Sequence, residues 1–208
     1  GVFFWQAYSP ATTCSPSRGA ILSCKHPVRL DRTAVRGGHP PMPYNQRSAL
    51  ISPWQRGALD AAEITIAESL KSNGYKTGHS GKWHVGIART DQPLPKEQGF
   101  DFSKHGFGSH KRMKDRTTGF ATTNPSDPFY LDDDGFPFDD ITQDGLDFMK
   151  GNKDNPFFLF YCSRLVHTPI HTRSEALLRK YYEKLGVEYP KEKDIWDEAG
   201  QKNAYYAA

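Results

Sequence analysis

The sequence lacks any apolar run long enough to cross a membrane, and it lacks a segment dominated by charge of one sign. A membrane-spanning helix needs about 20 consecutive apolar residues, whereas this chain of 208 residues mixes 27 basic with 24 acidic side chains along its length. No internal repeat or low-complexity tract is present. These features argue against a membrane span. The net charge of +3 gives no basic stripe of the kind that binds nucleic acid.

Cysteine is scarce, with three residues at Cys14, Cys24 and Cys162. An odd number cannot all be paired, so the spacing describes no disulfide framework. Cys24 and Cys162 either pair or stay free, and the sequence does not decide between these. An initiating methionine and a signal peptide are also lacking. We therefore expect a fragment of a longer protein.

Segments of strand and helix character alternate along the chain. Runs of β-formers predict strands over residues 2–8, 75–81 and 156–162, and periodic apolar positions predict helices over residues 15–24, 59–72, 141–150 and 174–185. The continuous apolar run 156–162 is typical of a buried central strand. Residues 28–58 and 88–139 are interpreted as loops because they are rich in Gly, Pro and polar residues. The alternation favours an α/β fold with helices on both faces of a parallel or mixed sheet.

The stretch Cys14-Ser15-Pro16-Ser17-Arg18-Gly19 combines a cysteine with the start of a helix. Ser15 is a favourable N-cap residue, and Pro16 suits the first helical position. Cys14 would then lie at the positive end of a helix, one turn from Arg18, in a place suited to an anion. The residues alone leave two interpretations open, an activated thiolate nucleophile or a small buried apolar side chain.

Two motifs together resemble the signatures of the sulfatase family. Cys-x-Pro-x-Arg at Cys14–Arg18 is similar to the maturation signature, in which the cysteine is oxidised after synthesis to formylglycine, an aldehyde. The second stretch, Gly74-Tyr75-Lys76-Thr77-Gly78-His79-Ser80-Gly81-Lys82-Trp83-His84, is similar to the second family signature. The resemblance implies an α/β fold of the alkaline-phosphatase-like type, an α/β/α sandwich with a central, mostly parallel sheet that is incomplete at both ends. It makes residues 1–208 part of a single catalytic domain.

The resemblance also implies a role for each candidate catalytic residue. Cys14, as hydrated formylglycine, would attack sulfur and form a covalent sulfo-enzyme intermediate, while Arg18 would hold the hydrated aldehyde. Lys82 would contact a sulfate oxygen, and His84 would act as the base for sulfate release. These two lie two positions apart, so on a strand they would point the same way, with Trp83 directed into the core. Taken alone, Lys82 would be interpreted as a solvated surface lysine, and the shared motif reverses that interpretation.

Histidines farther along the chain complete the implied site. His167 follows the strand at 156–162 and would bind sulfate and assist the leaving group, and His171 is a weaker candidate for substrate recognition. The other histidines are interpreted as structural or solvated, namely His26, His39, His79, His105 and His110.

The family uses a divalent metal, usually calcium, beside the formylglycine. The resemblance places its carboxylate ligands, and a further lysine, outside this sequence, so that Cys14 is the single metal-ligand candidate and residues 1–208 alone are expected to be inactive. Asp132-Asp133-Asp134-Gly135 does not have the spacing of an EF-hand and is interpreted as a solvated acidic loop. The sequence departs from the family at Cys24, where relatives commonly have glycine.

The predicted function is hydrolysis of a sulfate monoester, on a sulfated sugar or polysaccharide by family analogy. The same analogy implies a maturation enzyme that makes formylglycine, and a periplasmic or secreted location. Three alternatives stay open. The first is a phosphate or phosphonate monoester hydrolase of the same superfamily, the second a non-catalytic binding protein that keeps the fold, and the third a thiol enzyme that uses unmodified Cys14.

Overall fold

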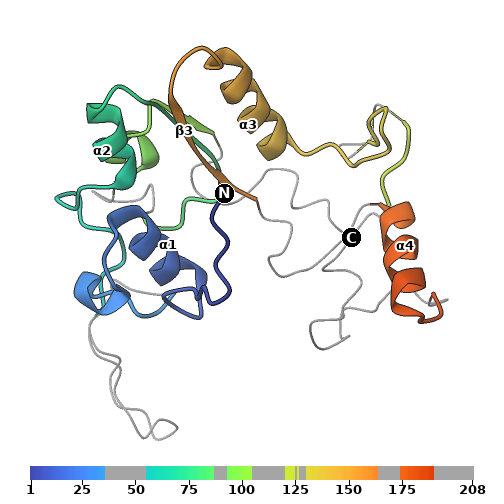
Figure 1. Ribbon diagram of the computed structural model, residues 1–208, viewed down its shortest axis with the longest axis horizontal. Coiled ribbons are helices and arrows are strands. Elements are labelled where there is room, and N and C mark those ends of the chain that lie inside the picture. Colours follow the sequence, from blue (N-terminus) through green and yellow to red (C-terminus); the bar gives the residue numbers. More distant parts are fainter. Residues whose placement is uncertain are drawn as a thin grey trace, which may run out of the picture. The chain divides into compact units, whose positions relative to one another are not determined.

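The computed structural model describes residues 1–35, 55–86, 93–104, 120–124, 126, 130–163 and 174–189. In these ranges the helices are α1 (Cys14–Ser23), η1 (Pro27–Leu30), α2 (Ile66–Ser72), η2 (Pro95–Gln98), α3 (Asp140–Gly151) and α4 (Glu175–Leu185), and the strands are β1 (Lys76–Gly81), β2 (Phe102–Lys104) and β3 (Phe157–Cys162) (Figure 1). The chain divides into two compact units, residues 1–108 with 144–162 and residues 109–143 with 163–208. The predicted α/β class is confirmed.

The sheet belongs to the first unit and has the strand order β2-β1-β3, with both pairings parallel. Gly78 is the register partner of Phe102 on one side and of Leu159 on the other. The predicted parallel sheet is therefore confirmed. The prediction that β3 is a central strand is wrong for the described sheet, because β1 lies in the middle and most of β3 is only half-buried.

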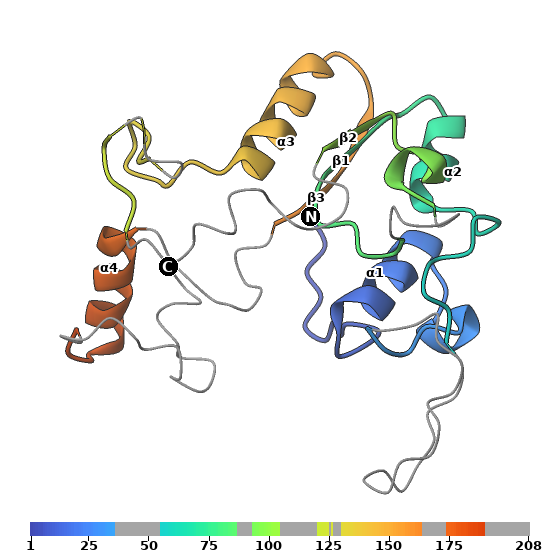
Figure 2. The ribbon, with the colours of Figure 1, turned by 180° about the vertical axis from the view of Figure 1, so that it is seen from behind.

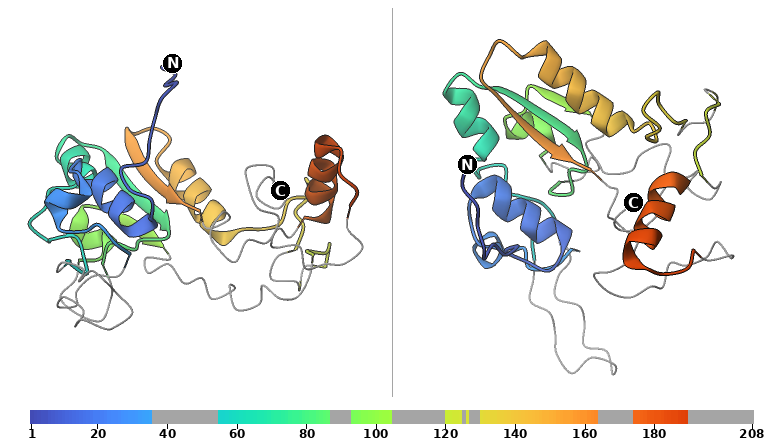
Figure 3. Two further views of the ribbon diagram at one scale, coloured as in Figure 1. Left: turned by 90° about the horizontal axis from the view of Figure 1, so that it is seen from below. Right: turned by 45° about the vertical axis from the view of Figure 1, so that its right-hand side comes forward.

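Side chains that alternate along the strands build two different faces. Phe158 and Phe160 of β3 point into the main core, on the same face as α1 and α2. That core also contains Leu22, Leu30, Leu59, Ala67, Trp83, Val85 and Phe100. The right-hand view of Figure 3 shows the sheet between these two helices and α3. Helices thus cover both faces, as predicted.

Helix α3 packs on the other face of the sheet, which is visible from behind in Figure 2. The ring of Phe148 lies over Gly78, so closely that a Cβ at position 78 would come within 2.8 Å of it. The same ring contacts Phe102 and Phe157, with ring centroids 5.4 and 6.0 Å apart. Glycine at position 78 therefore allows α3 to approach the central strand.

The central strand β1 is polar in sequence, and its polar groups are buried with partners. Thr77 donates its hydroxyl to the carbonyl oxygen of Gly99 at 2.6 Å. The ring of His79 is fully buried, with Nδ1 3.2 Å from Ser103 Oγ and Nε2 3.3 Å from the carbonyl oxygen of Lys82. Since buried polar groups are stable only when hydrogen-bonded, His79 is structural, as the sequence indicated.

Three predicted elements differ from the structure. Residues 2–8 form no strand. Val2, Phe3, Phe4, Trp5 and Tyr8 are 72–90% exposed there, because β-propensity without a pairing partner does not make a strand. The helix expected over 59–72 is confined to Ile66–Ser72, and the region 88–139, interpreted as irregular, contains η2 and β2. Strand β2 has only three residues, too few for a periodic pattern.

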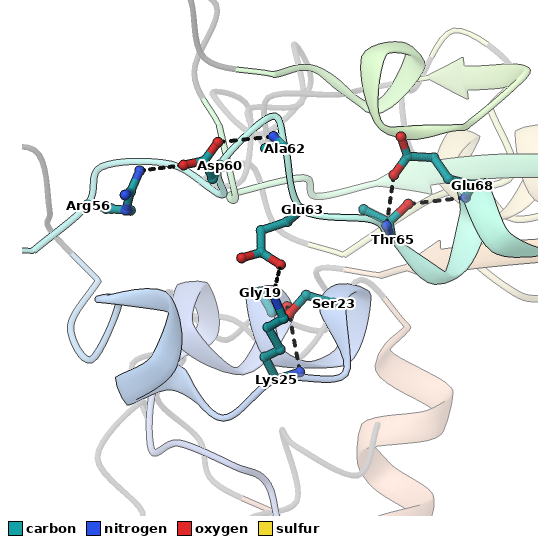
Figure 4. A network of polar contacts seen from close by, with 9 residues as sticks. All are labelled: Gly19, Ser23, Lys25, Arg56, Asp60, Ala62, Glu63, Thr65 and Glu68. Atoms are coloured by element: carbon teal, nitrogen blue, oxygen red, sulfur yellow. Dashed lines mark hydrogen bonds and ion pairs between the residues drawn. The ribbon is translucent and has the colours of Figure 1, made fainter.

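The late start of α2 has a visible cause in the polar contacts of Figure 4. The Asp60 carboxylate accepts a hydrogen bond from the backbone of Ala62 at 3.0 Å and closes a turn. Thr65 then caps the helix in a reciprocal capping box with Glu68. Glu63 pairs with Lys25 at 2.5 Å and so links this segment to the end of α1.

In the second unit, α4 begins after Ser174, whose side chain accepts a hydrogen bond from the backbone of Leu177. Leu178 and Tyr182 are its buried residues, and Phe120, Tyr181 and Tyr189 pack against them. This confirms the helix predicted over 174–185. The acidic loop is an exposed turn in which Asp132 Oδ1 accepts from the backbone of Asp134 and Phe136.

Cys24 ends α1 in the left-handed region, with φ 57° and ψ 24°. A side chain with a Cβ is strained there, whereas glycine is not. Cys24→Gly is therefore expected to raise the free energy of unfolding by about 0.5 to 1 kcal/mol, measured by urea denaturation. The matched variant Cys24→Ala keeps the Cβ and should bring no gain. An equal gain in both variants would show that backbone strain is not the cause.

Candidate active site

Helix α1 begins at Cys14 itself, one residue earlier than predicted. Its N-cap is Thr13, not Ser15, and the hydroxyl of Ser15 instead accepts a hydrogen bond from Arg32. Cys14 is half-buried. The sequence prediction that the cysteine stands at the positive end of a helix is therefore confirmed, although a different residue caps that helix.

The sulfur of Cys14 lies 3.2 Å from Nδ1 of His84. This contact joins the start of α1 to the segment that follows β1. It is possible because the chain turns there, with Gly81 at φ 98° and His84 at φ 58°. Strand β1 ends at Gly81, so the strand alternation from which we expected Lys82 and His84 to point the same way does not extend to them.

Arg18 fixes the backbone of the same turn. Its Nε donates to the carbonyl oxygen of Trp83 at 2.6 Å, and its Nη2 donates to the carbonyl oxygen of Lys82. The guanidinium carbon lies 5.3 Å from the centre of the Phe160 ring, in a cation–π contact. The Arg18 side chain thus holds the segment that carries the other candidate residues.

Lys82 and Trp83 are both buried, with exposures of 8% and 0%. The indole of Trp83 lies in the main core and donates to the carbonyl oxygen of Pro93 at 3.0 Å, as predicted for a core residue. The burial of Lys82 excludes the alternative of a solvated surface lysine. The backbone of Lys82 donates to the carbonyl oxygen of Cys162 at 3.1 Å, so the ends of β1 and β3 lie side by side.

Arg32 is a member of this cluster that the sequence did not indicate. It is 2% exposed, and its Nη2 donates to Ser15 Oγ and lies 3.5 Å from the carbonyl oxygen of His84. Burial lowers the pKa of Arg32 to about 10, so the guanidinium stays charged at neutral pH. No motif marks this position, because Arg32 lies in a segment interpreted as a surface loop.

Two candidate residues, His167 and His171, lie outside the described residues, as do His39, His105 and His110. Their roles stay predictions. His26 is exposed, and its Nδ1 accepts from the backbone of Val28 at 3.4 Å, which is a structural role in capping η1.

A cavity of about 380 Å³ lies elsewhere on the sheet, lined by Lys76, Asp101, Phe102, Asp147, Phe148 and Asn152. Lys76 and Phe102 are the first residues of their strands, so this cavity is at the amino ends of β1 and β2. None of the candidate residues lines it. Lys82 and His84 instead follow the carboxyl end of β1, the edge of α/β sheets at which sites are usually assembled.

A family model described as Sulfatase matches residues 1–208. The chain belongs to the sulfatase family. An arylsulfatase of Hemicentrotus pulcherrimus is 30% identical over 194 residues, covering 84% of this chain and 32% of the relative. The N-acetylgalactosamine-6-sulfatase of Mus musculus is 28% identical over 199 residues, covering 85% of this chain and 35% of the relative. This sulfatase chain therefore spans about a third of the length of these relatives.

Solved structures agree on the fold. The crystal structure of the protein named Ps i-CgsB is 21% identical and superposes with a TM-score of 0.57, covering 96% of this chain and 42% of that one. The resemblance read from the two signatures is thus confirmed at the level of family and fold. In addition, none of the helices formed by the described residues is long and apolar enough to span a membrane.

The described part of this sulfatase does not by itself fit a calcium site. Within it, no group of three or more His, Cys, Asp or Glu side chains could hold a metal ion. Unmodified Cys14 offers sulfur and His84 offers nitrogen, whereas calcium takes six to eight oxygen ligands. We therefore derive no catalytic step through calcium from these residues.

The three cysteines are all free, which answers the open question of a Cys24–Cys162 pair. Cys24 is exposed and Cys162 is buried, and burial raises the pKa of the Cys162 thiol although nearby Arg18 partly opposes this. Since the thiolate is the reactive form, iodoacetamide at pH 7.5 is expected to label Cys24 at least about tenfold faster than Cys162. Peptide mass spectrometry measures this. Equal labelling rates would contradict the buried, protonated state of Cys162.

Proposed function

We propose that the full-length protein hydrolyses a sulfate monoester at the Cys14–His84 pair. The observation that carries the proposal is the 3.2 Å contact between Cys14 Sγ and His84 Nδ1, in a chain of the sulfatase family. We further propose that Cys14 is converted to formylglycine by a maturation enzyme. The hydrated aldehyde would supply a hydroxyl as nucleophile and a second hydroxyl through which sulfate is later expelled.

The residues around Cys14 suit an anionic ester. The amino end of α1 carries a partial positive charge at Cys14. Lys82 is buried on the turn that also carries His84, and an ammonium in surroundings of low dielectric constant acts strongly on a sulfate oxygen. His84 Nδ1 stands where it can accept a proton from a hydroxyl at position 14. Arg18 holds the turn and supplies further positive charge beside it.

The remaining roles follow the family. We propose that His167 binds sulfate and assists the leaving group, that His171 contributes to substrate recognition, and that residues 1–208 are part of one catalytic domain. A sulfated sugar is the proposed substrate class, supported by relatives named N-acetylgalactosamine-6-sulfatase. We also propose a secreted or periplasmic location for the full-length protein.

Paired substrates test the reaction class. The full-length protein should hydrolyse 4-nitrophenyl sulfate with a kcat/KM at least about a hundredfold above that for 4-nitrophenyl phosphate, because the chain belongs to the sulfatase family and enzymes discriminate substrates by differential binding of their transition states. A preference for the phosphate would favour the phosphate monoester hydrolase instead. Hydrolysis of neither ester by protein with converted Cys14 would favour a binding protein that keeps the fold.

A further inference from the structure

Arg32 lies in an environment that is unusual for a charged side chain. It is 2% exposed, yet its guanidinium has only neutral partners among the described residues, namely the hydroxyl of Ser15 and the backbone carbonyl of His84. Its Nε and Nη1 are buried without any hydrogen-bond partner among the described residues. Burying a charge and two unpaired donors costs free energy. An apolar side chain would fill the same space without that cost, so packing alone does not account for an arginine here.

The side chain lies along one face of α1. A Cβ at Gly19 would come within 3.9 Å of Arg32 Nε and within 4.0 Å of its Cδ. Ser15 is one helical turn before Gly19, so the two positions share a face. The guanidinium passes over Gly19 and ends at Ser15, the residue directly after Cys14.

Arg32 also reaches the backbone of His84, which is strained. His84 has φ 58°, a conformation that non-glycine residues rarely adopt and that surrounding contacts must hold in place. In the turn from Lys82 to Val85, each of the four carbonyl groups accepts a hydrogen bond or lies near a donor. Arg18 donates to the carbonyl oxygens of Lys82 and Trp83. Arg32 Nη2 lies 3.5 Å from the carbonyl oxygen of His84, and the backbone of Leu59 donates to that of Val85 at 2.7 Å.

We propose that Arg32 is a positioning residue for the Cys14–His84 pair. One nitrogen, Nη2, contacts both the side chain next to Cys14 and the backbone of His84. It thereby ties the start of α1 to the turn after β1 and sets the separation of the two reacting groups. The expected effect of Arg32 on the reaction rate rests on the proposed sulfatase function. Its expected effect on the stability of the turn at residues 82–85 does not.

Hydrogen exchange of the full-length protein tests the structural half of the proposal. Arg32→Met is expected to speed backbone exchange about tenfold or more in the peptide covering residues 82–86, with little change in β3, since local opening becomes easier. Ser15→Ala removes the other end of the contact and should give the same local change if Arg32→Met does not fold. Arg29→Met, at an exposed arginine of η1, is the matched control. It should leave the exchange rates of residues 82–86 and of β3 unchanged. Unchanged exchange at residues 82–86 in both test variants, or a uniform rise across the protein, would overturn the proposal.

Turnover of 4-nitrophenyl sulfate tests the catalytic half, with rates divided by the fraction of converted Cys14. Arg32→Met should lower kcat by about 10- to 100-fold while KM changes less than about threefold, because misplaced groups slow the reaction more than they weaken binding. Arg32→Lys keeps the charge and a single donor nitrogen, and it should recover part of the loss in kcat. An unchanged kcat in Arg32→Met would overturn the positioning role. Absence of turnover in the wild type would instead refute the proposed function, and hydrogen exchange would still decide on Arg32.

Discussion

Replacing Cys14 by alanine in the full-length protein is expected to lower the turnover of 4-nitrophenyl sulfate by at least about a thousandfold, because it removes the nucleophile and leaves only binding and charge stabilisation. The methyl group fits the half-buried site at the start of α1, so the free energy of unfolding should change by less than about 1 kcal/mol. The measurement is steady-state hydrolysis with purified protein whose fold is verified by circular dichroism.

Cys24→Ala is the matched control for this experiment. Cys24 is exposed and lies at the far end of the same helix, so the identical chemical change there should leave kcat within about twofold of the wild type. Residual activity of Cys14→Ala above one tenth of the wild-type rate would show that position 14 is not the nucleophile. The chemistry would then have to be sought at another residue.

Replacing Arg18 by lysine is expected to have the second largest effect, although the charge is kept. Lysine lacks the planar fork through which Nε and Nη2 reach the carbonyl groups of Trp83 and Lys82. At least one buried carbonyl then loses its donor, and the contact of the guanidinium with the Phe160 ring is lost. We expect the free energy of unfolding to fall by about 2 to 4 kcal/mol and kcat to fall by about a hundredfold as His84 moves away from Cys14.

Urea denaturation and 4-nitrophenyl sulfate hydrolysis measure the two effects of Arg18→Lys separately. Arg179→Lys on α4 makes the same substitution at an exposed ion pair with Glu175 and should change the free energy of unfolding by less than about 0.5 kcal/mol. If Arg18→Lys lost activity but kept full stability, Arg18 would act on the substrate or the hydrated aldehyde rather than on the turn. That outcome would support the role implied by the family resemblance, in which Arg18 holds the hydrated aldehyde.

Local patterns in the sequence predicted much of this fold. Helix α4 was expected over residues 174–185 because its apolar positions recur at helical spacing, and the structure has Glu175–Leu185, with Ser174 as the N-cap. Strand β3 was expected over 156–162 from its continuous apolar run, and the structure has Phe157–Cys162. In both cases the residues that determine the element lie within it.

The candidate site depends on contacts between distant segments, and there the sequence predicted less. The two signatures pointed to Cys14 and His84, which the fold brings together across 70 positions. The left-handed turn at His84 and the buried Arg32 were not predicted. No local pattern marks either one, because each is stabilised by hydrogen bonds to residues far away in the chain. Strand β2 was missed for a similar reason, since its three residues are defined by pairing with β1.

The most direct test of the proposed function is the mass of the tryptic peptide that carries Cys14, taken from full-length protein made in its native host. The proposal predicts an aldehyde at position 14, seen as the loss of the thiol mass and trapped by a hydrazide. An intact Cys14 thiol in protein that nevertheless hydrolyses aryl sulfates would contradict the formylglycine mechanism and make the unmodified cysteine the nucleophile.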